Sequence, residues 1–150
     1  ETLGSAGRVT VLDDFAHNPD KISAAISALK AFPGRLHVMF QPHGFGPTKM
    51  LKAGLVQALI EGLGQEDHVW MPEIFYAGGT VDKSISSADL VNEIDVAGIP
   101  STFVADREDL VKQIVSVVEE GDRVVIMGAR DDTLTNFGRE LLIQIEKRAS

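Results

Sequence analysis

The stretch that decides the fold is Val9 to Pro19, with the sequence VTVLDDFAHNP. Its apolar beginning, Val9 to Leu12, has the residue types of a buried strand, and this run ends in the carboxylates Asp13 and Asp14. After a short polar turn comes Pro19, a residue that suits the first position of a helix. In open α/β sheets the loop that leaves the carboxyl end of a strand faces the ligand crevice. The stretch therefore predicts a strand, a site loop and a helix.

The rest of the chain repeats this alternation. Strand patterns are predicted at residues 8–12, 36–40, 68–71, 102–104 and 124–127, and a helical pattern follows each of them. Asn18, Ser86 or Ser87, and Asp106 are expected to cap helices, while the second helix is expected to begin near Thr48. We predict a single Rossmann-like α/β domain over residues 8–150, with a mostly parallel sheet of five to six strands and helices on both faces. Residues 1–7 are expected to be a linker from a missing upstream region.

Composition limits the classes of function. With 150 residues, 44% of them hydrophobic, the chain is long enough to bury a core as one domain. The absence of cysteine excludes disulfides and a cysteine nucleophile, and it fits a cytosolic protein. A net charge of −8 argues against nucleic acid or an anionic membrane as a partner. No apolar run is long enough to cross a membrane.

Polar residues that could carry chemistry follow the predicted strands. His17 and His43 follow the first two strands, which are often neighbours, so we expect both to face one edge of the crevice together with Asp14. Because Asp13 and Asp14 are adjacent, they point to opposite faces; one can be structural while the other accepts hydrogen bonds from a ribose. No further residue has convincing spacing for a metal site. His37 and His68 lie within strand patterns and are expected to be structural.

Two later loops are weaker candidates. The segment GARDDT, residues 128–133, leaves the last strand; its amides and Arg130 would suit an anion, and a plain capped turn explains it equally well. The loop with Glu73, Tyr76, Gly78 and Gly79 allows close approach of a backbone, or simply a tight turn. The segment GFGPTK is not a phosphate loop, because the order and spacing of its glycines and lysine do not fit that pattern.

Read together, four segments resemble the C-terminal domain of the Mur ligase family, most closely its muramate–alanine and muropeptide ligase branch. They are DDFAHNP, FQPHGFGPT, PEIFYAGGT and MGARD, in that order along nearly the whole chain. The resemblance implies an ATP-dependent amide ligase that joins an amino acid or peptide to a UDP-N-acetylmuramate precursor, in peptidoglycan synthesis or recycling. It also implies missing N-terminal and central domains, which would hold the phosphates of ATP and the Mg²⁺. Neither a metal site nor a complete catalytic set is therefore expected in this domain, which should be inactive alone.

The resemblance also implies roles for single residues. Asp14 matches the aspartate that contacts the ATP ribose, and Phe15 takes the place of a tyrosine near the adenine. Contacts to ATP are also expected from His17 and from Asn18, which replaces the second histidine of the motif. The residues expected to bind the amino substrate are His43, Lys49, Arg130 and Asp131.

One departure from the family pattern concerns the amino substrate. Gly44 and Pro47 stand where the family has two arginines, near the incoming amino acid and the muramyl carboxylate. Lys49 and Arg130 are the candidates to replace the missing positive charge. We therefore expect the substrate to differ from free L-alanine, or to be held differently.

Two other functions remain open from the residues. A phosphoacceptor receiver domain is also five-stranded with an acidic pair after its first strand, but it needs an aspartate after the third strand and a lysine after the fifth. The sequence has Glu73 and Arg130 there. A non-catalytic nucleotide-binding scaffold is the other alternative.

Overall fold

The structure, a computed structural model, describes residues 1–76, 78, 81–129 and 131–149. These residues form a six-stranded sheet with the strand order β1-β2-β6-β3-β4-β5, parallel except for β1. The strands are β1 (Thr2–Ala6), β2 (Val9–Asp14), β3 (Leu36–Gln41), β4 (His68–Met71), β5 (Ser101–Phe103) and β6 (Arg123–Gly128). The helices are α1 (Pro19–Lys30), α2 (Phe45–Gly62), α3 (Ser87–Val96), α4 (Arg107–Val117) and α5 (Asp132–Ala149). The predicted fold class is confirmed.

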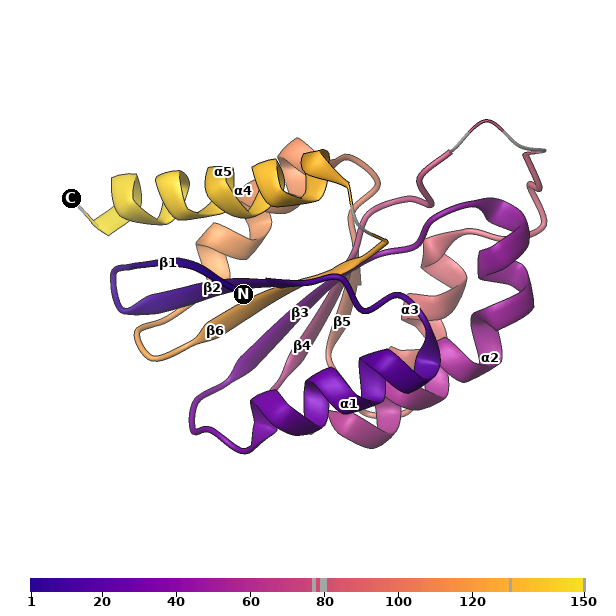
Figure 1. Ribbon diagram of the computed structural model, residues 1–150, viewed down its shortest axis with the longest axis horizontal. Helices are drawn as coiled ribbons and strands as arrows, with labels where there is room; N and C mark the ends of the chain where they lie inside the picture. Colours follow the sequence, from indigo (N-terminus) through magenta and orange to yellow (C-terminus); the bar gives the residue numbers. More distant parts are fainter. Residues whose placement is uncertain (77, 79–80, 130, 150) are drawn as a thin grey trace.

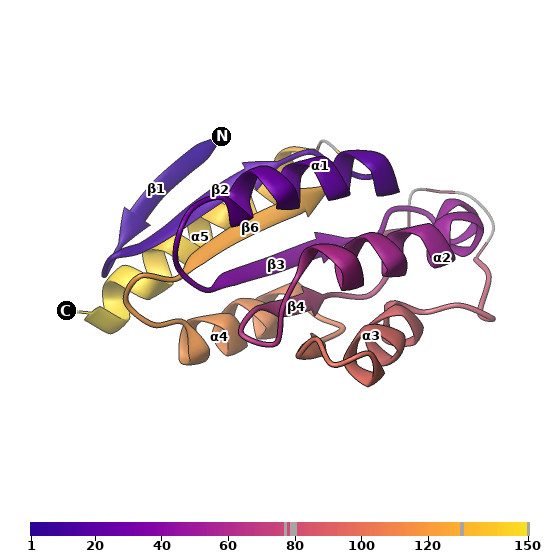
Figure 2. The same ribbon diagram turned by 90° about the horizontal axis from the view of Figure 1, so that it is seen from below.

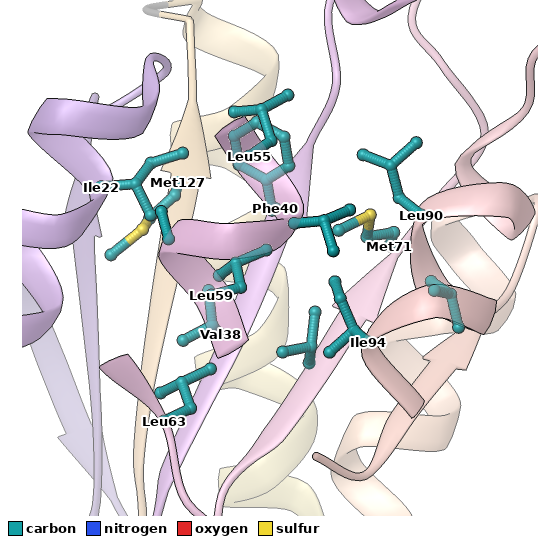
Figure 3. Close-up of a cluster of buried hydrophobic side chains, with 14 of the residues drawn as sticks. Ile22, Val38, Phe40, Leu55, Leu59, Leu63, Met71, Leu90, Ile94 and Met127 are labelled. Atoms are coloured by element: carbon teal, nitrogen blue, oxygen red, sulfur yellow. The ribbon is translucent and has the colours of Figure 1, made fainter. Parts of the chain in front are cut away.

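The helices cover both faces of the sheet. Figure 1 shows α4 and α5 on one side of the strands and α1, α2 and α3 on the other. Each layer has its own hydrophobic core, and Figure 3 shows part of the core under α1, α2 and α3. There Ile22, Leu55 and Leu90, one from each helix, pack over Val38 and Met71 of the strands. The core on the other face includes Met39, Trp70, Leu110, Ile114, Val124, Leu141 and Ile145.

The order of the strands creates a crevice beside β6. This strand comes last in the sequence but lies between β2 and β3, pairing in parallel with both. The chain leaves β2 and β3 toward helices on one face, whereas it leaves β6 toward α5 on the other face (Figures 1 and 2). Such a divergence is the topological switch point at which open α/β sheets bind ligands. The expectation that the first two predicted strands are neighbours was wrong, because β6 separates β2 from β3.

Local signals placed most helix starts correctly. The side chain of Asn18 accepts a hydrogen bond from the Lys21 amide at 2.9 Å, and Asp106 accepts one from the Glu108 amide at 2.8 Å. Ser86 caps α3 in a capping box with Asp89. The second helix begins earlier than expected, at Phe45 rather than near Thr48. Proline is tolerated in this first turn because the amides there have no partner inside the helix.

The expectation that residues 1–7 are only a linker is corrected for Thr2–Ala6. These residues form β1, an antiparallel edge strand in which Thr2 pairs with Leu12 and Ala6 with Val9. Gly7 and Arg8 make the turn, with φ angles of 53° and 62°. A two-residue hairpin turn with positive φ at both positions matches the twist of the flanking strands. Whether this strand follows an upstream region stays a prediction.

No helix in the described part of the chain is long and apolar enough to cross a membrane.

Candidate functional site

The two loop histidines meet at the switch point. A pocket of about 210 Å³ at the carboxyl ends of β3 and β6 is lined by His17, Gln41, His43, Pro47, Thr48 and Ala129, among others. His17 comes from the loop after β2 and His43 from the loop after β3, while Ala129 follows β6. The tertiary structure therefore brings both histidines to one pocket, as expected, although their strands are not adjacent. Asp14, which was expected beside them, does not line this pocket.

The two aspartates that end β2 face different surroundings. Asp13 is buried, and its Oδ2 accepts a hydrogen bond of 3.4 Å from the Thr135 hydroxyl of α5. Asp14 is only half-buried, and its Oδ1 accepts one of 3.0 Å from the Ala16 amide, which tightens the loop. Asp14 and Phe15 line an open hollow beside α1, separate from the histidine pocket. Of the pair, Asp14 is thus the residue available to a ligand.

His17 and Asn18 have defined local contacts. The Nδ1 atom of the exposed His17 lies 3.0 Å from the Phe15 carbonyl oxygen, which can only accept, so Nδ1 carries the proton. The Nε2 atom is then the acceptor of this ring in its neutral form. The side-chain oxygen of Asn18 caps α1, so this residue has a structural role whatever it contributes to ATP binding.

The loops after β3 and β4 are joined at His43. The rings of His43 and Phe75 stack with centroids 5.2 Å apart and planes inclined by 20°. Backbone hydrogen bonds of 2.9 Å run from the Gly44 amide to the Phe75 carbonyl and from the Phe75 amide to the Pro42 carbonyl. The imidazole of His43 is therefore held against an aromatic ring at the rim of the pocket.

Lys49 is already neutralised. Its Nζ donates to Asp82 Oδ2 at 3.1 Å and to the Ser84 hydroxyl at 2.9 Å. Hydrogen bonds from Ser84 and Lys49 lower the pKa of Asp82 to about 2, so this carboxylate is charged at neutral pH. A substrate anion would have to compete with Asp82 for Lys49.

The loop after β6 holds the remaining predicted residues. Arg130 lies outside the described residues. Asp131 Oδ1 accepts hydrogen bonds from the Thr133 amide at 2.6 Å and the Leu134 amide at 3.3 Å, and so caps α5. Burial would raise the pKa of Asp131, but the hydrogen bonds from Thr133 and the charge of Arg107 lower it below its ordinary value. Its second oxygen, Oδ2, is buried without a hydrogen-bond partner.

Glu73, the acidic residue of the fourth candidate loop, has a structural role. Its Oε1 accepts hydrogen bonds from the Ile74 amide at 2.9 Å and the Ser87 amide at 3.0 Å. Its Oε2 accepts one of 2.7 Å from the Ser86 hydroxyl. Both oxygens thus hold the N-terminus of α3 in place. Tyr76 and Gly78 of this loop are exposed, and Gly79 lies outside the described residues.

Sequence reasoning missed Gln41 and Arg107. Only the preceding Asp106 was singled out, as a helix cap, although Arg107 also follows β5 and therefore lies at the same edge of the sheet. Its Nε donates a hydrogen bond of 2.9 Å to Gln41 Oε1, and its Cζ lies 5.6 Å from the centroid of the Phe75 ring. A basic residue directly after a strand pattern was the available signal, but only the tertiary structure brings it to Gln41.

Residues 1–130 of the chain match the sequence model of a protein family, which is described as "Mur ligase, glutamate ligase domain". The chain belongs to the Mur ligase family. This Mur ligase domain is 35% identical over 143 residues to a UDP-N-acetylmuramate–L-alanine ligase of Lachnospira eligens, covering 95% of this chain and 30% of that protein. It thus spans less than a third of the length of this relative.

Solved structures have the same fold. The murein peptide ligase of Psychrobacter arcticus superposes with a TM-score of 0.70 at 20% identity, covering 97% of this Mur ligase domain and 29% of that chain. The MurF ligase of Thermotoga maritima, solved in complex with ADP, gives a TM-score of 0.60 at 18% identity, with coverages of 98% and 31%.

Proposed function

We propose that this domain is part of an ATP-dependent ligase that joins an amino acid or peptide to a UDP-N-acetylmuramate precursor. The observation that carries the proposal is the 35% identity with a UDP-N-acetylmuramate–L-alanine ligase across 95% of the chain. The position of the histidine pocket supports it, because the pocket lies at the switch point of the sheet, where α/β domains bind ligands.

In this proposal, one side of the crevice binds the nucleoside of ATP. Asp14 uses Oδ1 within its own loop, and Oδ2 accepts from a ribose hydroxyl. Phe15 lines the same hollow and is assigned to the adenine. His17 and Asn18 complete this side, with Asn18 acting mainly through the position of α1. The ADP complex of the MurF relative supports a nucleotide for this fold.

The phosphates and Mg²⁺ are assigned to domains upstream of this one. ATP would supply the phosphoryl group that activates the muramyl carboxylate for attack by an amine. The sequence has no phosphate loop. Within the described ranges, no group of three or more His, Asp or Glu side chains is arranged to hold a metal ion. This domain then contributes contacts to the nucleoside and the amino substrate, with His43, Lys49, Arg130 and Asp131 on the amino-substrate side.

The biological setting follows from the same proposal. An enzyme of this kind would act in the cytoplasm, where ATP and UDP-linked precursors are available, and would serve peptidoglycan synthesis or recycling. The receiver alternative loses its acidic candidate, because Glu73 is occupied in capping α3. Acetyl phosphate with magnesium should accordingly leave the domain unlabelled.

The test uses the full-length protein that contains this domain. Purified enzyme is incubated with UDP-N-acetylmuramate, magnesium-ATP and a panel of amino acids and muropeptides, and both ADP and the amide product are measured by mass spectrometry. We expect product only when all three substrates are present, and lower turnover in His43→Gln. His68→Gln is the matched control, because His68 contacts Thr102 on β5 and does not line the pocket. An enzyme that binds ATP but forms no product with any acceptor would contradict the proposal.

A further inference from the structure

The guanidinium of Arg107 is compensated only by a carboxylate beyond ion-pair distance, that of Asp131, within the part of the chain that the structure describes. Within the described ranges, none of the ion pairs involves Arg107. Its Nη2 atom is buried and has no hydrogen-bond partner. Burial lowers the pKa of Arg107, and only the more distant charge of Asp131 opposes this. Leaving a buried donor unpaired is unfavourable, so an acceptor that reached Nη2 would be bound favourably.

The neighbours of Arg107 fix its orientation. Gln41 donates from Nε2 to the carbonyl oxygens of Pro42 and Glu73, at 2.8 and 3.0 Å, which leaves its Oε1 facing Arg107. At the other end of the guanidinium, Nη1 donates to the Thr133 hydroxyl at 2.8 Å. The planar group is thus held at two nitrogens before any ligand arrives. Nη2 and the second hydrogen of Nη1 remain, and two neighbouring N–H groups of a guanidinium can recognise a carboxylate through two parallel hydrogen bonds.

Arg107 lies next to the histidine pocket. Gln41, the hydrogen-bond partner of Arg107, lines that pocket. The guanidinium of Arg107 also lies over the ring of Phe75, and this ring stacks on His43. Arg107 and Thr133 also border a second hollow of about 540 Å³ between α4 and α5, so the side chain is only partly covered, although Nη2 itself is buried. An anion that enters either hollow would reach Nη2 by displacing the atoms that cover it.

We propose that Arg107 is the residue that binds the carboxylate of the amino substrate; this rests on the proposed function. Gly44 and Pro47 bring no charge to the pocket, and Lys49 is held by Asp82. A carboxylate would accept a hydrogen bond from the unpaired Nη2 of Arg107. A phosphate group would bring more negative charge close to Asp131, which is itself a carboxylate. Arg107 thereby determines that the acceptor carries a free carboxylate near its amine.

The test measures binding of carboxylates to the 150-residue chain by NMR, with ¹⁵N labelling. Acetate and L-alanine are titrated against acetamide and L-alaninamide, which lack the negative charge. We expect the Nε–Hε signal of Arg107 to shift with the two carboxylates and to stay unchanged with the two amides. Arg107→Gln should weaken L-alanine binding by about ten- to a hundred-fold, the effect of losing a charged hydrogen bond. Arg107→Lys should also weaken it, because an ammonium lacks the planar fork.

The control is Arg8→Gln, the same loss of charge at a turn near the amino ends of the parallel strands, where Arg8 pairs with Glu120. It should bind L-alanine like the native chain. Thermal melting checks that each variant is folded. If Arg107→Gln is not folded, the comparison is made with Arg107→Lys instead. Equal shifts with carboxylates and amides, no response to either carboxylate, or unchanged binding by a folded Arg107 variant would overturn the inference.

The outcomes separate this inference from the proposed function. If the full-length enzyme forms product but carboxylate binding does not depend on Arg107, only the assignment of Arg107 is refuted. If carboxylate binding requires Arg107 but the full-length protein forms no amide, the ligase function is refuted and the carboxylate-binding site is retained.

Discussion

Lowering the pH from neutral toward 5 should destabilise the domain through two histidines at the amino ends of the strands. His37 is fully buried, and its Nδ1 lies 3.1 Å from the indole Nε1 of Trp70, which can only donate. Its Nε2 therefore carries the proton and donates to Asp122 Oδ2 at 2.9 Å. A second proton would place two donors against each other. Burial, the largest cause, accordingly lowers the pKa of His37 despite the charge of Asp122.

The pKa of His68 allows the size of this loss of stability to be calculated. Its ring stacks on Trp70 with centroids 4.0 Å apart, and burial with the nearby charges of His37 and Arg35 lowers its pKa from 6.5 to about 4. The unfolded chain binds the proton of His68 more tightly than the folded chain does. The contribution of His68 to the free energy of unfolding is therefore complete above pH 6.5 and is lost as the pH falls toward 4. The full shift corresponds to roughly 3 kcal/mol, of which about 2 kcal/mol is lost by pH 5. His37 acts in the same direction.

Urea unfolding followed by the fluorescence of Trp70, the single tryptophan of the chain, measures the effect. Between about pH 7.5 and 5, the loss of unfolding free energy in His68→Gln should be about 2 kcal/mol smaller than in the native chain. The glutamine can still hydrogen-bond to Thr102, which now contacts His68 Nε2 at 2.8 Å. The measurement stops near pH 5, because the lowered pKa values of Asp82, Asp122 and Asp131 add a further loss at lower pH. Equal pH dependence in the two proteins would refute the reasoning.

Three further predictions concern the nucleotide site and the backbone. In the full-length enzyme, Asp14→Ala should raise the KM for ATP by about ten- to a hundred-fold, through loss of a charged hydrogen bond; unchanged ATP kinetics with a lower Tm would make Asp14 purely structural. The 150-residue chain alone should bind magnesium-ATP only at about millimolar Kd and release no phosphate, as measured by calorimetry and phosphate assay; micromolar binding or turnover would show a complete site. Gly98→Ala, at φ +100° in open space, should cost about 1 kcal/mol in urea unfolding. Gly34→Ala should cost clearly more, because its Cβ would lie 2.5 Å from the Gly121 carbonyl oxygen; equal costs would contradict the clash.

The sequence by itself determined the elements and most of their ends. Short apolar runs predicted β3, β4 and β6, because burial on both faces of a sheet requires continuous hydrophobic residues. The strands β2 and β5, which are buried less completely, were also predicted from their apolar residues. Asn18, Ser86 and Asp106 marked helix starts, since each satisfies amides within three residues of itself in the chain. The four segments of the family resemblance were also visible, because they are contiguous. These features depend on residues close together in the chain, so the sequence alone is enough to predict them.

The tertiary structure decided the order of the strands and the partners of the polar side chains. Nothing local places β6 between β2 and β3, so the meeting of His17, His43 and Ala129 depends on pairing between distant segments. The β1 hairpin was missed because its strand is weakly apolar and is exposed or only partly buried along its length.

The same reason explains why the roles of Glu73 and Arg107 were not visible in the sequence. Glu73 accepts hydrogen bonds from residues 13 and 14 positions away, and Gln41 and Arg107 are 66 positions apart. Whether a charged side chain is used inside the fold or remains for a ligand depends on which distant groups reach it. Only folding brings those groups together.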